Sequence, residues 1–352
     1  MKPLPILLPF SYLYGAFVAF RNLLFDLGIL PVTHLPVPVI SVGNISAGGT
    51  GKTPIVELIA RHLMAHSLRV AIVSRGYRRT STGLVVVSEG RGAQVDAESG
   101  GDEPVMLSEK LPQAIVVVDE KRVRGATFAV DQLKADVVVL DDGFQHRYLG
   151  RDLDIVVMPV REILANDHML PAGYRRESYN SLQRADLVIV TKSDGGTSTR
   201  RALDMLTGMN VRQSACAVLR PVAWRIAGVD LRIPLEESSG RNVVAFTGIG
   251  DPAGFRQTLQ SLNVTIQRMV TYPDHHWFGP EDLDSLASIL WQTKADYLVT
   301  TEKDLKRLES RLDRFKSFVE ENPVHVLEVQ ASMQEGASVL DELLHTLFHE
   351  PI

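Results

Sequence analysis

The residues best suited to chemistry form a glycine-rich run that ends in a lysine and a threonine. The run reads Ser46, Ala47, Gly48, Gly49, Thr50, Gly51, Lys52 and Thr53. In such a loop, backbone N–H groups close around phosphate oxygens, the lysine reaches the β- and γ-phosphates, and the threonine hydroxyl takes a Mg²⁺ position. Serine occupies the first position, where the usual P-loop pattern has glycine. The alternative is a glycine-rich turn before an ordinary helix, with Lys52 as a solvated surface charge.

A second polar set follows an apolar segment at residues 137–140. It comprises Asp141, Asp142 and, three residues later, Gln145. An acid at the end of a buried strand beside a phosphate loop can hold Mg²⁺, directly or through water. Adjacent side chains of a strand point to opposite faces, so we expect the two aspartates to have different roles. The alternative is an acidic turn that holds no ligand.

Three other polar turns have both a chemical and a structural interpretation. Asp102 follows two glycines, and it could face phosphate or metal, or cap the helix after it. His275 lies next to acids and could act as a general base near neutral pH, or belong to a turn before a helix at 280–292. Residues 191–194 (Thr-Lys-Ser-Asp) resemble the base-reading turn of P-loop GTPases, although a plain polar turn explains them as well.

The elements that must position these residues alternate between apolar strands and amphipathic helices. A buried strand at 38–42 leads into the glycine-rich run, and a helix with Ile55, Ile59 and Leu63 on one face follows it. Further apolar runs occur at 70–73, 115–118, 137–140, 155–158 and 187–190. Several of these runs are continuous rather than alternating, as in a parallel sheet buried on both faces. They predict an α/β domain over residues 36–210, of the P-loop NTPase type with a mostly parallel sheet.

The pattern changes in the second half of the chain. Residues 211–240 predict a short antiparallel ribbon that serves as a linker, with strands at 218–226 and 231–234. Residues 241–352 predict a second, smaller α/β domain. Its expected strands and helices are 243–247, 252–262, 264–270, 280–292, 297–300 and a final helix at 337–347. Residues 80–100 are polar and rich in glycine and serine, so we expect an exposed loop there.

Residues 1–35 form a separate region, because large apolar side chains dominate the first thirty positions. Prolines break its start and Arg21 interrupts it, so the apolar stretch is marginal for a membrane span. No small-residue cleavage site follows, so we do not expect a signal peptide. We predict a helix in the membrane interface, with its aromatic residues in lipid and Arg21 at the headgroups. The alternative is a helix packed on the protein's own core.

Composition limits the classes of function. The chain has 352 residues, of which 45% are hydrophobic and 22% are charged, and these values are typical of a globular protein with an ample core. The net charge of −5 does not favour a nucleic-acid partner. The single cysteine, Cys216, excludes a disulfide within the chain and favours a reducing compartment.

Taken in order, the motifs resemble those of the tetraacyldisaccharide 4′-kinases, which act in the lipid A pathway of Gram-negative bacteria. The resemblance covers nearly the whole chain. It rests on short motifs at residues 7–14, 39–44, 74–77, 101–104, 141–146, 170–173, 176–177, 246–249, 274–275 and 300–304. The family's loop also tolerates serine at the first P-loop position. One departure is Tyr174-Arg175, at a place where a smaller apolar stretch is expected.

The resemblance implies an enzyme that uses ATP and Mg²⁺ to phosphorylate the 4′-hydroxyl of an acylated glucosamine disaccharide 1-phosphate. It implies an active site between two α/β units and an N-terminal helix at the cytoplasmic face of the bacterial inner membrane. The implied partners are this substrate and the inner leaflet of the membrane. Neither a nucleic acid nor an obligate protein partner is expected.

The resemblance also assigns roles to individual residues. Lys52 and Thr53 bind phosphate and Mg²⁺, and His275 helps Asp102 accept the proton of the 4′-hydroxyl. The implied metal and phosphate environment includes Asp141, Asp142, Gln145 and Glu177. Contacts with substrate or phosphate are implied for Tyr77 and Arg122. Because the carboxylate and the imidazole lie on different units, we expect the base to be completed when the units close.

Two other classes of function stay open from the residues. A P-loop GTPase or a partner-regulating ATPase would use residues 191–194 to read guanine. A membrane-peripheral binding protein would have a degenerate nucleotide site and would not need Lys52. Nucleotide preference and the effect of a Lys52→Ala substitution distinguish both classes from a kinase.

Overall fold

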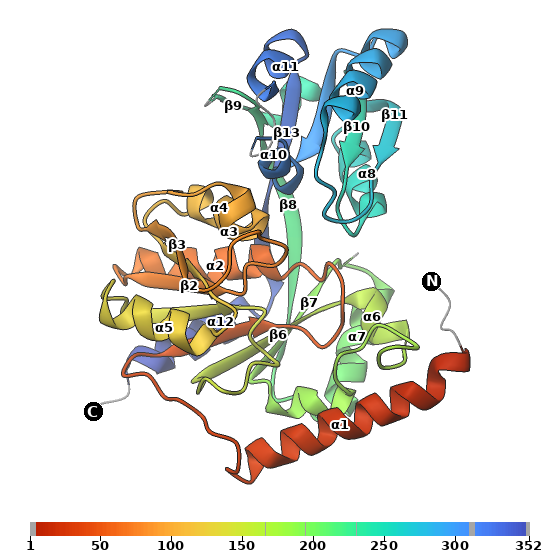
Figure 1. The fold of residues 1–352 in the computed structure, drawn as a ribbon. Coiled ribbons are helices and arrows are strands. Elements are labelled where there is room, and N and C mark those ends of the chain that lie inside the picture. The colour runs from red at the N-terminus through yellow and green to blue at the C-terminus, as the bar shows by residue number, and fades with distance from the viewer. Residues whose placement is uncertain (1–4, 166, 194, 230, 310–313, 350–352) are drawn as a thin grey trace.

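The structure, a computed structural model, describes residues 5–165, 167–193, 195–229, 231–309 and 314–349. A single thirteen-stranded sheet runs through these residues and carries helices on both faces (Figure 1). The sheet extends through two lobes that lie one above the other in Figure 1. We call the lower one, residues 36–210, the P-loop lobe and the upper one, residues 231–321, the C-terminal lobe.

The P-loop lobe is built on a mostly parallel sheet. Its strands are β1 (Val39–Gly43), β2 (Val70–Ser74), β3 (Val85–Glu89), β4 (Ile115–Val118), β5 (Val137–Asp141), β6 (Leu153–Pro159) and β7 (Leu187–Thr191). β1 pairs in parallel with both β5 and β6, so the glycine-rich run that follows β1 leaves the middle of the sheet. Every strand predicted for this lobe is present, and the predicted α/β fold class is confirmed.

Helices cover both faces of this part of the sheet. They are α2 (Lys52–Ala65), α3 (Ala97–Gly100), α4 (Asp102–Lys110), α5 (Arg122–Asp131), α6 (Val160–Ala165), α7 (Thr197–Gly208) and the 3-10 helix η2 (Tyr179–Arg184). α2 and α4 pack on the face where Ile40 and Val42 of β1 lie. α5, α6 and α7 pack on the opposite face, where Val39 and Val156 lie. Burial on both faces is the reason that the strands read as continuous apolar runs.

The prediction of an exposed loop over residues 80–100 is wrong. This segment contains β3, which pairs antiparallel with β4 at the edge of the sheet, and the short helix α3. Val87 and Ser88 of β3 are completely buried. The surrounding glycines and serines obscure a strand of only five residues, whose burial depends on α3 and α4 packing over it.

The C-terminal lobe is a smaller α/β layer. Its elements are η3 (Leu235–Ser238), β10 (Asn242–Thr247), α8 (Pro252–Ser261), β11 (Thr265–Thr271), α9 (Pro280–Thr293), β12 (Tyr297–Thr301), α10 (Glu302–Glu309) and α11 (Phe315–Glu321). β10 pairs in parallel with β11 and β12. α9, α10 and α11 cover one face around Phe246, and α8 covers the other face around Val299.

Two long strands join the lobes. They are β8 (Ser214–Ile226) and β13 (Val324–Glu335), which pair antiparallel along nearly their whole length. The predicted ribbon partner, β9 (Leu231–Ile233), pairs with only the last three residues of β8. The strand order is therefore β11-β10-β12-β13-β8-β7-β6-β1-β5-β2-β4-β3, which makes one continuous sheet across both lobes. β13 was not predicted from the sequence, because its residues mix polar and apolar types and pair with positions far earlier in the chain, such as Ile226 with His325.

The C-terminal helix returns to the P-loop lobe. α12 (Ala337–His349) places Leu340 and Leu344 in the same apolar cluster as Ile55 and Ile59 of α2. The prediction included this helix in a unit spanning residues 241–352. The division of the chain into domains remains a prediction, but the core that α12 completes belongs to the P-loop lobe.

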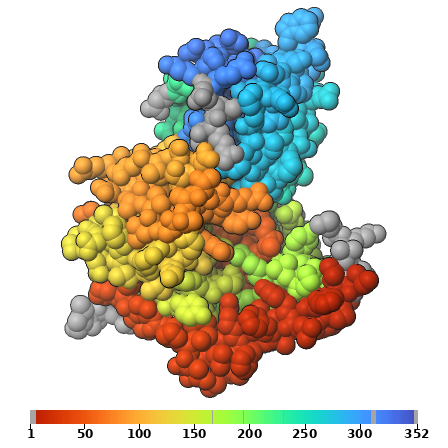
Figure 2. All heavy atoms as spheres, in the orientation of Figure 1, coloured from red at the N-terminus to blue at the C-terminus, as the bar shows by residue number. Residues whose placement is uncertain are grey.

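The N-terminal helix α1 (Leu8–Asp26), preceded by the 3-10 turn η1 (Pro5–Leu7), lines one end of the P-loop lobe (Figures 1 and 2). It buries Ser11, Val18 and Phe25, one residue every seven positions. Large apolar side chains at or near the helix are exposed, namely Ile6, Phe10, Tyr12, Leu13, Phe17, Phe20, Leu23, Leu27 and Ile29. No helix in the described part of the chain has the length and apolarity that a membrane crossing requires.

Candidate active site

The glycine-rich run is held in place by side chains on both sides. Asn44 Nδ2 donates to Thr50 Oγ1 over 3.0 Å, and Thr191 Oγ1 donates to the Thr50 carbonyl over 2.7 Å. At the start of the run, Ser46 Oγ donates to the Glu162 carboxylate. These contacts hold the loop against Asn44 after β1, Thr191 at the end of β7 and Glu162 of α6.

Two glycines give the loop its shape. Gly48 and Gly51 have φ angles of 125° and 89°, a region that residues with a side chain rarely adopt. A Cβ atom placed on Gly48 or Gly49 would meet no other atom within 4 Å. The outer side of the loop is therefore open, as a phosphate cradle requires, and it leads directly into the N-terminus of α2.

The two aspartates after β5 have different surroundings. Asp142, at φ 56°, accepts two hydrogen bonds from Arg176 at 2.9 and 3.0 Å and lies 3.4 Å from Lys52 Nζ. Burial opposes its charged form, but Lys52 and Arg176 outweigh burial and hold the pKa of Asp142 well below its usual range. Asp141 is buried and its Oδ1 has no hydrogen-bond partner. Burial and the nearby Glu103 raise the pKa of Asp141 to about 7.

This arrangement can accommodate Mg²⁺ together with nucleotide phosphates. No group of three or more His, Cys, Asp or Glu side chains within the described ranges could hold a metal ion. Mg²⁺ bound to a nucleotide usually takes only one or two protein oxygens and completes its shell with phosphates and water. The unpaired Oδ1 of Asp141 and the Thr53 hydroxyl, which donates to Glu103 Oε2 over 3.0 Å, supply such oxygens.

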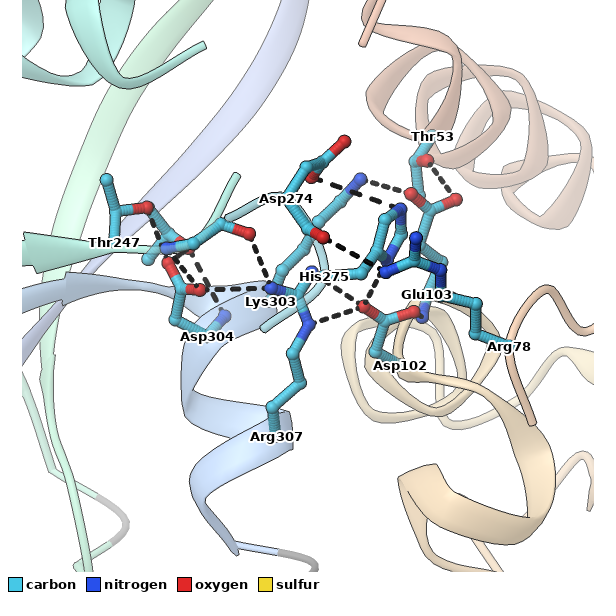
Figure 3. Close-up of polar contacts among 12 residues, drawn as sticks. Thr53, Arg78, Asp102, Glu103, Thr247, Asp274, His275, Lys303, Asp304 and Arg307 are labelled. Carbon is cyan, nitrogen blue, oxygen red and sulfur yellow. Dashed lines mark hydrogen bonds and ion pairs between the residues drawn. The ribbon is translucent and has the colours of Figure 1, made fainter. Parts of the chain in front are cut away.

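A buried carboxylate lies between the lobes, at the N-terminus of α4 (Figure 3). Asp102 Oδ2 accepts a hydrogen bond from Arg307 Nε at 2.8 Å and forms an ion pair with Arg307 Nη2 at 2.7 Å. His275 Nδ1 lies 3.3 Å from the same oxygen. Burial raises the pKa of Asp102, but His275 and Arg307 outweigh burial and hold it well below its usual range. The carboxylate is therefore ionised and is bound by two side chains from the C-terminal lobe.

The neighbouring acid links the same lobe to the phosphate loop. Lys303 pairs with one oxygen of Glu103, and Thr53 donates to the other. Asp102 and Glu103 are adjacent in α4, whereas Lys303 and Arg307 are one turn apart in α10, so two acids face two cations across the lobe boundary (Figure 3).

The remaining predicted residues lie around these two centres. The Tyr77 ring meets the His275 ring edge-on at 5.3 Å between centroids. Arg122 Nη1 donates to the Asp142 carbonyl over 2.9 Å, and Gln145 Nε2 donates to the Asn44 carbonyl over 2.8 Å. The structure therefore brings these residues to the predicted site.

Glu177, which was predicted to lie in the metal environment, contacts α1 and Arg184 instead. Its carboxylate accepts hydrogen bonds from Asn22 of α1 at 2.9 Å and from Arg184 at 3.1 Å. The adjacent Arg176, which the prediction did not assign, instead reaches Asp142. Side chains of successive residues in an extended segment point in opposite directions, which explains the exchange.

Comparison with known proteins places the chain in a family. A model of the family described as Tetraacyldisaccharide-1-P 4′-kinase matches residues 4–348. The chain belongs to this family. It is 38% identical over 338 residues to the tetraacyldisaccharide 4′-kinase of Anaeromyxobacter dehalogenans (strain 2CP-C), which covers 94% of this chain and 87% of that protein.

The crystal structure of a second relative is known. The tetraacyldisaccharide 4′-kinase of Aquifex aeolicus (strain VF5) is 37% identical over 306 residues, or 86% of this chain and 89% of that protein. The crystal structure of "apo" form LpxK from Aquifex aeolicus in complex with ATP matches with a TM-score of 0.78 and 34% identity. The match covers 97% of this chain and 98% of that one.

Three further side chains at the site were not assigned as site residues from the sequence, although two of them belong to the motifs at 176–177 and 300–304. Arg176, Lys303 and Arg307 each bind an acid of the site. The sequence does show that Lys303 and Arg307 lie four positions apart in α10, so both side chains share one face of that helix. The sequence does not show which acids that face meets.

The turn that resembled a GTPase motif has structural partners. Thr191 supports the phosphate loop through Thr50, and Lys192 pairs with Asp251 at the N-terminus of α8 in the C-terminal lobe. Asp194, which would read guanine in a GTPase, lies outside the described residues. Lys192 therefore joins the lobes on the side of the site away from α4.

We predict that Arg176→Ala lowers the free energy of unfolding at pH 7 by about 1–2 kcal/mol, because two hydrogen bonds to a carboxylate are lost. The loss stays modest since the Asp142 side chain is 38% exposed and water screens the pair. The pKa of Asp142 is lowered in the folded protein, so its stabilisation is present above about pH 4 and is lost below it. Urea denaturation at several pH values measures the difference.

Arg175→Ala is the matched control for this prediction. The Arg175 guanidinium lies over the Tyr179 ring at 4.3 Å and has no such carboxylate pair among the residues that the structure describes. Its removal should cost about 0.5–1 kcal/mol, and that cost should not shrink on acidification from pH 7 to about pH 2. Equal losses with equal pH dependence in both variants would contradict the assignment of Arg176 to Asp142.

Proposed function

We propose that the protein is an ATP-dependent kinase that phosphorylates the 4′-hydroxyl of an acylated glucosamine disaccharide 1-phosphate. The observation that carries the proposal is the ionised Asp102, 3.3 Å from His275, beside a phosphate loop to which Glu103 and Thr53 link it. Family membership names the reaction that this geometry suits. The acceptor, an alcohol, must lose a proton during transfer, and the pair provides the acceptor for it.

The phosphate side of the proposed reaction relies on position and charge. Phosphoryl transfer needs alignment and neutralisation of charge more than covalent chemistry from the protein. In this proposal the loop from Ser46 to Thr53 holds the phosphates and Lys52 neutralises their charge. Thr53 and Asp141 hold Mg²⁺, with Asp142 and Gln145 in the surrounding shell. Mg²⁺ would supply charge neutralisation at the β- and γ-phosphates.

The acceptor side relies on the pair between the lobes. His275 Nδ1 lies 3.3 Å from Asp102 Oδ2, so the imidazole can share a proton that Asp102 accepts from the hydroxyl group. The proposed pair accepts the proton late, when the oxygen has begun to bond to phosphorus. Tyr77, 59% exposed beside His275, and Arg122, beside Asp142, are proposed to contact the sugar or its phosphates.

We also propose that α1 lies in the cytoplasmic interface of the bacterial inner membrane. Its apolar side chains at Phe10, Leu13, Phe17 and Phe20 are each more than half exposed, and a water-exposed row of this kind is costly. Acyl chains of the substrate could then stay in lipid while the sugar enters the site. The helix also packs on the protein through Ser11, Val18 and Phe25, as the alternative sequence interpretation expected.

The central prediction is that Lys52→Ala abolishes transfer of radiolabelled γ-phosphate to the acylated disaccharide 1-phosphate in detergent. Asp102→Ala should lower kcat by about 10²-fold or more, the usual scale for a lost general base. Asp102→Asn should lose the same activity, although the asparagine side chain keeps the shape of the aspartate. Wild-type protein without transfer, or an Asp102→Ala variant at near-normal rate, would contradict the proposed function or the proposed base respectively.

Nucleotide and metal dependence test the proposal against a GTPase. We predict that excess unlabelled ATP suppresses the labelled transfer, whereas the same concentration of GTP suppresses it at least about tenfold less, a difference of about 1.4 kcal/mol in binding. Removal of divalent cations with EDTA should stop turnover, and Mg²⁺ should restore it. Tight GTP binding without lipid phosphorylation would favour the GTPase interpretation.

A third prediction concerns α1. Replacing Phe10, Phe17 and Phe20 by serine should weaken sedimentation with vesicles that contain anionic lipid, because about 2 kcal/mol of apolar burial is lost for each side chain. The variant should keep its melting temperature, since these side chains face away from the core. Val18→Ser is the control, because this buried residue should change stability more than vesicle binding. Unchanged sedimentation of the triple variant would exclude α1 as the membrane contact.

A further inference from the structure

Arg307 is a buried cation that pairs with a carboxylate of the opposite lobe. Its side chain is only 1% exposed, although it belongs to α10 of the C-terminal lobe. Two of its nitrogens, Nε and Nη2, bind Asp102 Oδ2 at 2.8 and 2.7 Å. A guanidinium with no exposure must have a partner for its charge, and here the main partner is the proposed catalytic carboxylate.

The third nitrogen of Arg307 is anchored within its own lobe. Arg307 Nη1 donates to the Gly248 carbonyl over 2.7 Å and to Asp304 Oδ1 over 3.1 Å. Asp304 is itself fixed by Thr247, which donates to it over 2.6 Å, and by Thr301 at 2.7 Å. Asp304 is completely buried. The planar guanidinium therefore has a single orientation, which its own lobe determines before the other lobe is considered.

Apart from Arg307, few groups hold the Asp102 carboxylate in place. Its Oδ1 accepts a hydrogen bond from the Glu103 N–H at 3.0 Å, which follows from its place at the start of α4. Its Oδ2 is shared between Arg307 and His275 (Figure 3). Lys303, the other cation of α10 nearby, is bound to Glu103 and not to Asp102. Arg307 is thus the side chain whose loss would free the carboxylate to rotate away from His275.

We propose that Arg307 is a positioning residue for phosphoryl transfer, which fixes Asp102 Oδ2 against His275 from the C-terminal lobe. The proposal rests on the proposed function. Asp304 and the Gly248 carbonyl hold Arg307, Arg307 holds Asp102, and Asp102 holds His275. The proton-accepting pair is therefore built by the packing of both lobes, and misplacement of a reacting group by about 1 Å can lower a rate by about 10²-fold.

The test compares Arg307→Ala with wild type in the phosphate-transfer assay, with ATP and acylated disaccharide varied separately. We expect kcat to fall about 10²-fold while both KM values stay within about threefold, because neither substrate contacts Arg307 in this proposal. Guanidinium chloride at tens of millimolar should raise the kcat of Arg307→Ala at least about tenfold, since the ion fits the space left by the side chain. It should not raise the wild-type rate.

Arg225→Ala is the matched control. Arg225 of β8 also pairs across the lobes, with Glu109 of α4 at 3.6 Å, but it does not contact Asp102. This variant should keep kcat within about threefold and should not respond to guanidinium. An Arg307→Ala variant with normal kcat, or one that guanidinium does not restore while it remains folded and binds ATP, would overturn the positioning role.

A conservative variant keeps the test decisive if Arg307→Ala does not fold. Lysine supplies the charge but not the two-pronged geometry, so Arg307→Lys should fold and lose about tenfold in kcat at unchanged KM. A lysine variant with the wild-type kcat would reject the proposal. Absence of transfer by the wild-type protein would instead reject the proposed function, and the two failures are therefore distinguishable.

Discussion

The structure depends on keeping a charged carboxylate buried at the boundary of two lobes. Asp102 is 5% exposed, and an ion of this kind loses several kcal/mol of hydration when it leaves water. Only Arg307 and His275 of the C-terminal lobe compensate it with side-chain contacts in the described residues. The P-loop lobe thus contains a charge that it cannot stabilise alone, and this requirement fixes where the C-terminal lobe must lie.

Pairing of opposite charges across the lobe boundary extends along the whole length of α4 and α10. α4 and α10 meet through four acid–base pairs, which are Asp102–Arg307, Glu103–Lys303, Glu109–Lys306 and Lys110–Glu302. Such pairs add little stability when they are exposed, but they select one register between the helices because any shift would bring like charges together or leave a buried ion unpaired. Continuous pairing of β8 with β13 supports the same arrangement. The α4 side of the boundary therefore has one register, whereas on the other side the partly exposed Asp251 pairs with Lys192 and, at 4.0 Å, with Arg161.

Local chemistry explains what the sequence could reveal. The phosphate loop and the strands ending at 140 and 190 were predictable because each lies within one short segment whose residues specify its conformation. β3, β13 and the docking of α12 were not, since their burial depends on partners far away in the chain. The sequence likewise suggested Asp102 and His275 through family resemblance, but not the cation that orients them. Arg307 resembles any arginine on an amphipathic helix until the opposite lobe is in place.

The loop that follows residue 168 joins the N-terminal helix α1 to the nucleotide site. Ser11 and Tyr14 of α1 bind backbone groups of this loop, and the loop delivers Arg176 to Asp142 and to the Ser46 carbonyl. Removing α1 to obtain a more tractable protein would therefore withdraw support from the phosphate-binding backbone as well as the apolar surface proposed to contact lipid. A shortened chain that had lost activity would not distinguish poor access to lipid from a damaged catalytic centre.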